Sequence, residues 1–301
     1  MSTEPHIPFR TRLAPTPSGY LHLGNLVNFA WAWLWTKKYQ GQLILRIDDL
    51  DKGRWRPKYV EDIFRSLEWI GLAFDEGPSG PEDFYRNFSQ HTRLDQYATA
   101  IQILQEKQRL YACTCSRKQI LLASPDGSYP GTCSALHRPF EGPQTAWRIR
   151  TDRERVSWED RMMGPQTHLL EGNLTDFVIR KKDGLPAYQL ASLVDDVQMG
   201  VSFIVRGQDL QASTAAQLWL ARQLNYAPFL QAEFFHHPLI TQPDGQKLSK
   251  SEGAMALKTL REQGTQPARI IQHLGSLMGL SSPQGSWEEL MMAFVKEYGS
   301  A

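Results

Sequence analysis

The first fifty residues follow the hydrophobic pattern of a strand, a helix and a second strand. Short apolar strands are expected at 9–13 and 43–47, with an apolar helix at about 24–39 between them. Large aromatic residues, Trp31 and Trp35 among them, occupy nearly every face of this helix, which is typical of a buried helix rather than of a cofactor site. A strand–helix–strand unit of this kind predicts two parallel strands joined by a right-handed crossover.

The alternation of helices and strands continues along the chain and is interrupted once. Two more helices are expected, at 57–70 and 88–108. Between 111 and 185, short strands (146–150 and 176–180) lie among loops rich in Pro and Gly, which indicates an inserted domain. The earlier pattern then resumes, with helices at 187–197 and 211–224, a strand at 202–205, an apolar stretch at 234–240 and a helical last part.

We therefore predict an α/β protein built on a Rossmann-like, doubly wound parallel sheet with a short helical C-terminus. The expected parts are the first half of the sheet domain, the inserted domain, the second half and a C-terminal segment, at 1–110, 111–185, 186–250 and 251–301. Ligands of such sheets bind at the carboxyl ends of the strands. Because His22, Asp48 and Arg206 stand at or after the ends of three expected strands, we expect them to line one crevice.

Composition narrows the class of protein without identifying a partner. The chain has 301 residues, of which 41% are hydrophobic and 22% charged, as in ordinary globular proteins. It has no apolar run of transmembrane length, and residues 1–8 lack the apolar core of a signal peptide, so a cytoplasmic location without a membrane partner is expected. The net charge of +1 does not exclude RNA, because basic residues gather locally at 148–155 and 180–182.

A first motif, at 22–25, has the features of a phosphate site. It places the imidazole of His22 and the small residue Gly24 at the start of the first helix, followed by Asn25. Backbone N–H groups and the helix dipole favour an anion there. Alone, the motif is more typical of a surface His beside a capping Asn.

A second motif, more than two hundred residues later, supplies positive charge. Lys247, Ser249 and Lys250 follow a Pro-Asp-Gly turn and are expected to form a hinged loop. Its ammonium groups can close on the β- and γ-phosphates of a nucleotide and stabilise the charge that moves onto departing pyrophosphate. A lone basic loop is usually solvated, but the two motifs together predict an ATP site, with His22, Lys247 and Lys250 as catalytic residues.

Three cysteines, Cys113, Cys115 and Cys133, fall within 21 residues. An odd number grouped so closely favours a metal site in a reducing compartment over disulfides. Three thiolates are one ligand short of tetrahedral zinc. The phenol of Tyr129, four residues before Cys133, and the imidazole of His137 are the two candidates for the fourth ligand, and general ligand chemistry favours the imidazole.

The two phosphate motifs together resemble the paired signature motifs of class I aminoacyl-tRNA synthetases. The sequences around them resemble the glutamyl branch, namely RLAPTPSG at 12–19, LRIDDLD at 45–51, Tyr188 with VDD at 194–196, and VRGQD at 205–209. The likeness extends from about residue 9 to 275. It implies an enzyme that uses ATP and Mg²⁺ to activate glutamate.

The resemblance assigns glutamate binding to five positions. Arg12, Tyr188 and Arg206 would hold the side-chain carboxylate, and Thr16 and Asp48 would lie toward the α-amino group. This agrees with the chemistry, since a carboxylate pairs best with a guanidinium and an ammonium with a carboxylate.

Two positions depart from the glutamyl branch. Asp48 stands where those enzymes usually carry Glu, and Ser192 stands where they usually carry Asn. Because Asp reaches less far than Glu, a glutamine-like ligand is the alternative to glutamate.

The cysteine spacing is similar to the Cys-x-Cys…Tyr-x-x-x-Cys site of the glutamyl-queuosine tRNA(Asp) synthetases. That resemblance favours Tyr129 over His137 as the fourth ligand and implies a structural zinc, since no ligand position is left for water. The sequence also ends 50 residues after Ser251, and we expect the protein to lack the anticodon-binding domain of full glutamyl-tRNA synthetases, as members of that family do.

The resemblance therefore implies transfer of glutamate to the queuosine base of tRNA(Asp), with no DNA partner. The inserted domain at 111–185 is the expected zinc-containing, acceptor-binding part and would hold a flipped-out nucleotide. Three alternatives stay open. They are a minimal glutamyl-tRNA synthetase that charges a tRNA 3′ end, a paralogue that acylates another nucleophile, and a non-catalytic RNA-binding module.

Overall fold

The chain passes back and forth between two structural units, and the computed structural model describes residues 9–51, 53–239, 256–280 and 285–299. The first unit contains the residues up to 92, then 201–208 and those from 234 onward. The second contains 93–200 and 209–233. These bounds come from contacts within each unit, and the division predicted at 110, 185 and 250 stays a prediction.

Two parallel strands begin the first unit. β1 (Arg10–Leu13) and β2 (Gln42–Leu45) are joined through α1 (Leu23–Lys38) and pair from Arg10 with Gln42 to Leu13 with Leu45. The predicted strand–helix–strand unit is therefore confirmed. The backbone pairing continues past the two strands, because the N–H of Arg46 donates to the Leu13 carbonyl (2.9 Å) and that of Asp48 to the Pro15 carbonyl (2.9 Å).

A third strand, β8 (Phe203–Gly207), lies on the other side of β1. At its start the N–H of Ser202 donates to the Arg10 carbonyl (3.0 Å), and farther along Arg12 Nη1 donates to the Val205 carbonyl (3.2 Å). β1 and β8 therefore run in the same direction. β9 (Glu233–His237) is the neighbour of β8 in a sheet that is distinct from the pair β1 and β2. The common direction of β1, β2 and β8 agrees with an α/β arrangement.

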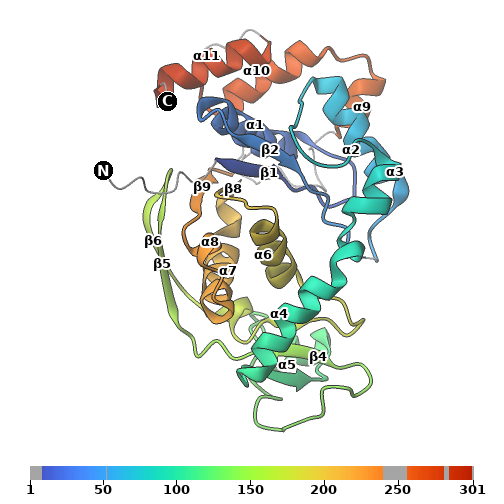
Figure 1. The fold of residues 1–301 in the computed structure, drawn as a ribbon, viewed down its shortest axis with the longest axis vertical. Coiled ribbons are helices and arrows are strands. Elements are labelled where there is room, and N and C mark those ends of the chain that lie inside the picture. The colour runs from blue at the N-terminus through green and yellow to red at the C-terminus, as the bar shows by residue number, and fades with distance from the viewer. Residues whose placement is uncertain (1–8, 52, 240–255, 281–284, 300–301) are drawn as a thin grey trace. The chain divides into compact units, whose positions relative to one another are not determined.

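The predicted aromatic helix is the centre of the core of the first unit. Trp31 and Trp35 are 2% and 6% exposed, and Trp35 packs edge-to-face against Phe235 and Phe294 with ring centroids 5.3 and 5.2 Å apart. α10 (Pro267–Leu277) and α11 (Trp287–Tyr298) both lie against α1 (Figure 1). The interpretation of these tryptophans as core residues is confirmed.

The remaining helices of the first unit are short apart from one. They are α2 (Pro57–Ile70), α3 (Pro81–Asp83), the π-helix η1 (Phe84–Phe88), the 3₁₀-helix η2 (Gln90–Arg93) and α9 (Leu257–Glu262). α2 has the bounds that the sequence predicted. Pro57 suits its first turn, and Gly71 ends it in the left-handed region at φ 70°.

The second unit contains a small antiparallel sheet, a β-hairpin and four longer helices. The sheet has the order β3 (Leu110–Cys113), β4 (Ala146–Ile149), β7 (Val178–Arg180), and the hairpin consists of β5 (Arg155–Asp160) and β6 (Gly164–Leu169). The helices are α4 (Leu94–Glu106), α5 (Arg117–Ala123), α6 (Tyr188–Gln198), α7 (Gln211–Leu224) and the single turn α8 (Ala227–Leu230). Two 3₁₀ turns complete the elements, η3 (Gly172–Leu174) and η4 (Gln208–Leu210).

The helix predicted at 88–108 is shorter than expected. It begins at Leu94, because the chain before it is held by the buried carboxylate of Asp49. That carboxylate accepts hydrogen bonds from the Ser89 hydroxyl (2.6 Å) and the Gln90 N–H (2.8 Å). These hydrogen bonds to a carboxylate 40 residues earlier in the sequence thus keep residues 89 and 90 out of the helix that the periodicity predicted.

Among the helices that the structure describes, none combines the length and the apolar character needed to cross a membrane.

We expect Gly77→Ala to destabilise the first unit. Gly77 has φ 131°, and a Cβ there would lie 2.6 Å from the Leu45 carbonyl, so the substitution should lower the free energy of unfolding by about 1–3 kcal/mol. Gly80→Ala is the control, because Gly80 is extended (φ 176°) and a Cβ there meets nothing within 4 Å. Urea denaturation measures both variants, and equal stabilities would contradict the predicted conflict at Gly77.

Candidate functional site

His22 is the capping residue of α1. Its Nδ1 accepts a hydrogen bond from the Gly24 N–H (3.1 Å), and its own N–H donates to Asn25 Oδ1 (3.1 Å), so the two side chains close a reciprocal capping box. Because Nδ1 is an acceptor, the proton of the neutral ring is on Nε2. The imidazole can therefore donate a hydrogen bond at the positive end of a 16-residue helix.

Gly24 is needed for this arrangement. A Cβ at that position would lie 3.0 Å from the Nδ1 and Cε1 atoms of the His22 ring. The structure thus brings His22, Gly24 and Asn25 together at one helix terminus, as the sequence predicted. Their role in binding ATP stays a prediction.

The chain returns to this helix terminus just after the lysine motif. Ala256 forms an antiparallel bridge with His22, and the N–H of Leu257 donates to the Leu21 carbonyl (2.7 Å). Lys247, Ser249 and Lys250 lie outside the described residues. The first described residue after them is therefore paired with the histidine of the other motif.

Two buried arginines lie on neighbouring strands at the carboxyl edge of the sheet. Arg12 on β1 and Arg206 on β8 are 4% and 3% exposed. The bond from Arg12 to the Val205 carbonyl joins the two strands just before Arg206. A guanidinium buried at such a position requires acceptors for its N–H groups, and a carboxylate is its best partner.

Asp48 and Thr16 meet at the same edge. The bond from the Asp48 N–H to Pro15 places the two loops side by side, with Thr16 exposed on one of them. Arg46, 2% exposed, forks onto the Asp48 carboxylate through Nε (2.7 Å) and Nη2 (3.2 Å).

Arg46 is a site residue to which the sequence motifs assign no role. The available signal was its spacing, since side chains two residues apart in an extended segment point to the same face. The two hydrogen bonds from the guanidinium orient the Asp48 carboxylate, and a carboxylate suits a partner that carries positive charge.

Tyr188 belongs to the second unit and is the first residue of α6. Its side chain is 46% exposed, whereas Ser192, one turn later, is buried at 1%. The structure thus places Tyr188 at an accessible helix start and Ser192 in the packing beneath α6.

A buried carboxylate holds α6 against α4 within the second unit. Asp195, which is fully buried, accepts hydrogen bonds from Arg93 Nε (2.9 Å) and from the Tyr97 hydroxyl (2.7 Å). Burial, together with the Asp195 charge, raises the pKa of Tyr97, so the phenol stays protonated and donates. The helix that carries Tyr188 is therefore fixed in position by a charge-assisted network.

The three cysteines converge within the second unit. Their sulfur atoms all lie within 4.8 Å of one another, and Cys115 Sγ is 3.6 Å from Cys133 Sγ. Sulfur ligands of a tetrahedral zinc with Zn–S bonds of 2.3 Å would be about 3.8 Å apart. The Tyr129 oxygen is 3.4 Å from Cys113 Sγ and accepts a hydrogen bond from the Cys133 N–H (2.9 Å). The donor set therefore fits zinc.

The pKa values of two thiols in the cluster are shifted in opposite directions. Burial alone would raise the pKa of the Cys133 thiol, but hydrogen bonds from the Thr114 backbone, from Tyr129 and from the other thiols lower it to about 7. Burial and the bond to Cys133 raise the pKa of Cys115 to about 11. Burial and the hydrogen bond with Cys113 raise the pKa of Tyr129, whose ring centre lies 3.7 Å from the Arg148 guanidinium.

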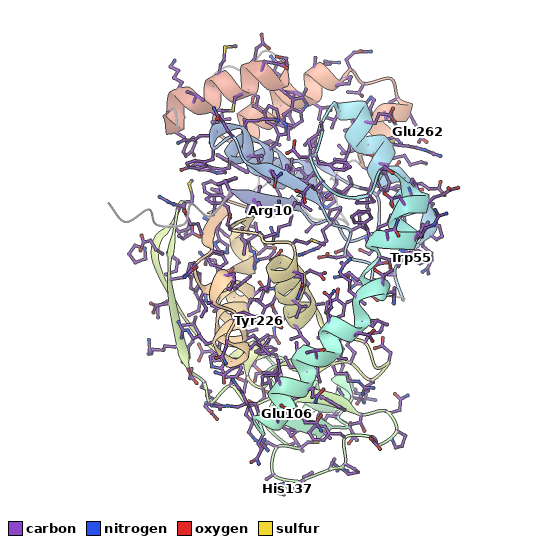
Figure 2. All side chains as sticks on the ribbon, in the orientation of Figure 1. Arg10, Trp55, Glu106, His137, Tyr226 and Glu262 are labelled. Carbon is purple, nitrogen blue, oxygen red and sulfur yellow. The ribbon has the colours of Figure 1, made fainter. Side chains whose placement is uncertain are left out.

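Among the described residues, His137 does not belong to the group whose ligand atoms converge at the cluster. It lies in an exposed loop at φ 44°, beyond Cys133 (Figure 2). The geometry therefore favours Tyr129 as the fourth donor.

Comparison with known proteins identifies a family that covers nearly the whole chain. The model of the family described as tRNA synthetases class I (E and Q), catalytic domain, matches residues 8–294. A protein of Symbiobacterium thermophilum called Glutamyl-Q tRNA(Asp) synthetase is 40% identical over 285 residues, which cover 89% of this chain and 86% of that protein. A protein of Dechloromonas aromatica with the same name is 39% identical over 274 residues, with coverage of 89% and 86%.

A solved structure shares the fold. It is a crystal structure of a glutamate tRNA ligase from Elizabethkingia meningosepticum in complex with its amino acid, with a TM-score of 0.76 and 25% identity. The match covers 94% of this chain, which spans 64% of the length of that structure.

We expect Arg46→Met to destabilise the fold by about 3–5 kcal/mol, because it removes the buried guanidinium that forks onto the Asp48 carboxylate. The double variant with Asp48→Asn should cost less than the sum of the single changes, with a coupling of about 0.5–3 kcal/mol in chemical denaturation. Arg65→Met is the matched control, since its pair with Glu61 is exposed and 3.6 Å long and should contribute about 0–1 kcal/mol. Additive costs for Arg46 and Asp48 would contradict the pairing.

Proposed function

We propose a function for this chain, which belongs to the class I tRNA synthetases for glutamate and glutamine. In this proposal the protein activates glutamate with ATP and transfers the glutamyl group to the queuosine base of tRNA(Asp). The observation that carries the proposal is the identity of 39–40% with relatives called Glutamyl-Q tRNA(Asp) synthetase. The site geometry supports it, because one helix terminus and one sheet edge offer groups for a phosphate and for an amino acid.

In the first step the α-carboxylate of glutamate attacks the α-phosphorus of ATP, and pyrophosphate leaves. No general base is needed, since the nucleophile is already ionised at neutral pH. Catalysis then consists of positioning and charge stabilisation. His22 would donate from Nε2 at the N-terminus of α1, and Lys247 and Lys250 would approach the phosphates together with Mg²⁺.

The amino acid would lie between fixed charges of opposite sign. Arg12 and Arg206, with the Tyr188 hydroxyl, would bind the side-chain carboxylate, and Asp48, with Thr16, would bind the α-ammonium group. Arg46 would compensate for the shorter reach of Asp48 by holding its carboxylate in one orientation. Glutamine, the alternative, would leave two buried guanidinium groups facing a neutral amide.

In the second step a hydroxyl of queuosine attacks the carbonyl carbon of the mixed anhydride, and AMP leaves. Three alternative outcomes are kept. The acceptor could instead be a tRNA 3′ end or another nucleophile, or the chain could be a non-catalytic RNA-binding module.

We also propose that the cluster holds a structural zinc, with Cys113, Cys115, Tyr129 and Cys133 as ligands. Its support is the spacing of the three sulfur atoms and the phenol oxygen within the second unit. With four protein ligands the metal would keep β3 and the loop before Cys133 together and take no part in the chemical step.

Exchange of pyrophosphate into ATP tests the activation step. We expect exchange with glutamate in the absence of tRNA, and little or none with glutamine and the other amino acids. Lys250→Ala should reduce it about 100- to 1,000-fold by removing charge stabilisation of the leaving group. Lys296→Ala removes an exposed lysine of α11 and should leave the rate unchanged.

The acceptor is identified with the same enzyme. tRNA(Asp) that carries queuosine should accept glutamate, and the same tRNA without queuosine should not. If none of the amino acids supports exchange, only the RNA-binding module remains. If tRNA(Asp) without queuosine accepts glutamate, the 3′ end is favoured as the acceptor.

Zinc analysis tests the metal proposal. The purified protein should contain about one zinc ion per chain, and Cys113→Ser and Tyr129→Phe should lose it in elemental analysis. His137→Ala should keep it. Retention by Tyr129→Phe together with loss in His137→Ala would show that the imidazole is the fourth ligand.

A further inference from the structure

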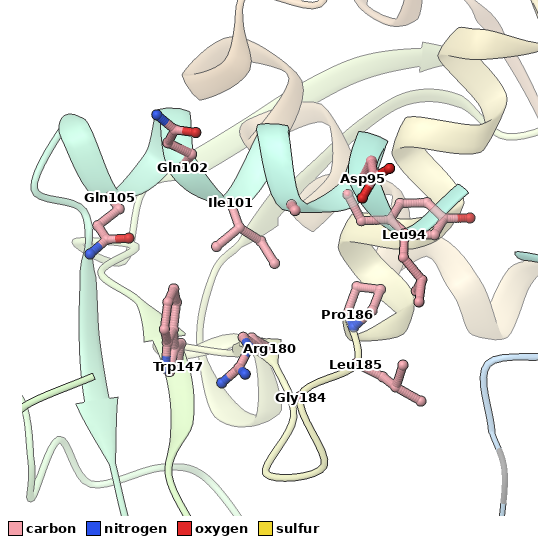
Figure 3. A pocket seen from close by; sticks show the side chains of 12 residues that line it. Leu94, Asp95, Ile101, Gln102, Gln105, Trp147, Arg180, Gly184, Leu185 and Pro186 are labelled. Atoms are coloured by element: carbon pink, nitrogen blue, oxygen red, sulfur yellow. The ribbon is translucent and has the colours of Figure 1, made fainter. Parts of the chain in front are cut away.

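A groove of about 500 Å³ lies wholly within the second unit, and none of its lining residues belongs to the cysteine cluster. One wall is the exposed side of α4, with Asp95, Gln102 and Gln105. The other is formed by Trp147 on β4 and by Arg180 at the end of β7 (Figure 3).

The second wall brings three flat groups together. The Arg180 guanidinium lies 4.8 Å from the centre of the Trp147 ring, and Phe140 packs on Trp147 with ring centroids 4.7 Å apart. The Trp147 Nε1 donates to the Phe140 carbonyl (3.0 Å), which fixes the ring. Gly184 allows this arrangement, because a Cβ there would lie 3.2 Å from Arg180 Nη2.

Arg180 has donors to offer to a ligand. Within the part of the chain that the structure describes, its guanidinium makes no hydrogen bond or ion pair, although the residue is half-buried. Arginine side chains at such depth usually have an acceptor. Asp95 and Gln105 on the facing helix add an acceptor and an amide at the opposite edge of the groove (Figure 3).

We propose that this groove binds one unpaired base of the RNA substrate, stacked on the guanidinium that Trp147 supports. A base offers a flat π-face to the Arg180 plane and polar edges to its N–H donors and to the α4 side chains. A duplex buries the faces of its bases in the helical stack, so it offers no π-face to the Arg180 plane. The proposal rests on the proposed function only in taking RNA as the substrate.

Filter binding with two RNA probes tests the groove. One probe is a stem–loop with the sequence of the tRNA(Asp) anticodon arm, and the other is a blunt RNA duplex with the same number of phosphates. Arg180→Lys keeps the charge but loses the plane, and it should weaken stem–loop binding roughly 5- to 150-fold while leaving duplex binding unchanged. Lys118→Ala, which removes an exposed charge of α5 outside the groove, is the matched control and should affect both probes only slightly.

A second variant changes a residue of α4 and leaves the strands of the sheet unaltered. Gln105→Trp fills the groove from the exposed side of α4 and should cause the same selective loss. Unchanged stem–loop binding in both groove variants, or an equal loss with the duplex, would overturn the proposal, as would tighter binding of an acidic peptide than of the stem–loop. Glutamate-dependent exchange uses no RNA, so its absence in the unaltered protein would refute the proposed function and leave the binding test valid.

Discussion

The candidate site depends on the backbone pairing that continues past the ends of β1 and β2. The bonds from Arg46 to Leu13 and from Asp48 to Pro15 hold two loops together where a parallel pair would otherwise separate. Side chains from both loops therefore face the same edge, and β8 adds its own at the other side of β1. Few backbone hydrogen bonds thus determine where the charged groups gather, in keeping with the tendency of parallel sheets to bind ligands at this edge.

Buried charge is paired in a similar way in both units. Arg46 with Asp48 in the first unit, and Arg93 with Asp195 in the second, each combine an ion pair with two hydrogen bonds. Desolvation makes such pairs a weak source of stability, but removing one partner is costly. Their value here is orientation, since one pair fixes a carboxylate at the site and the other fixes the helix that begins with Tyr188.

Elements with a strong local period could be predicted from the sequence, and those set by distant contacts could not. The helix at 57–70 agrees with prediction at both ends, because Pro57 and Gly71 mark them locally. The hairpin of β5 and β6 was not foreseen, since its alternation is brief and its outward positions are polar. Motifs located the helix terminus at His22 and the three cysteines. The support of Asp48 by Arg46 had only the spacing of two residues as its signal, and the groove beside Trp147 has no signature in sequence. The roles of the individual site residues remain predictions.

The ring at the start of α1 caps the helix through one nitrogen and, in the proposed function, would face a phosphate with the other. Its Nδ1 can close the first turn of the helix only while that nitrogen carries no hydrogen, and in that form the opposite nitrogen bears one. Adding a second proton would strengthen the pull on a phosphate but release the Gly24 amide. Acidification would therefore loosen the first turn of the helix at the moment its charge became most favourable. Protonation of this one imidazole would therefore change both the helix cap and the charge at the helix terminus.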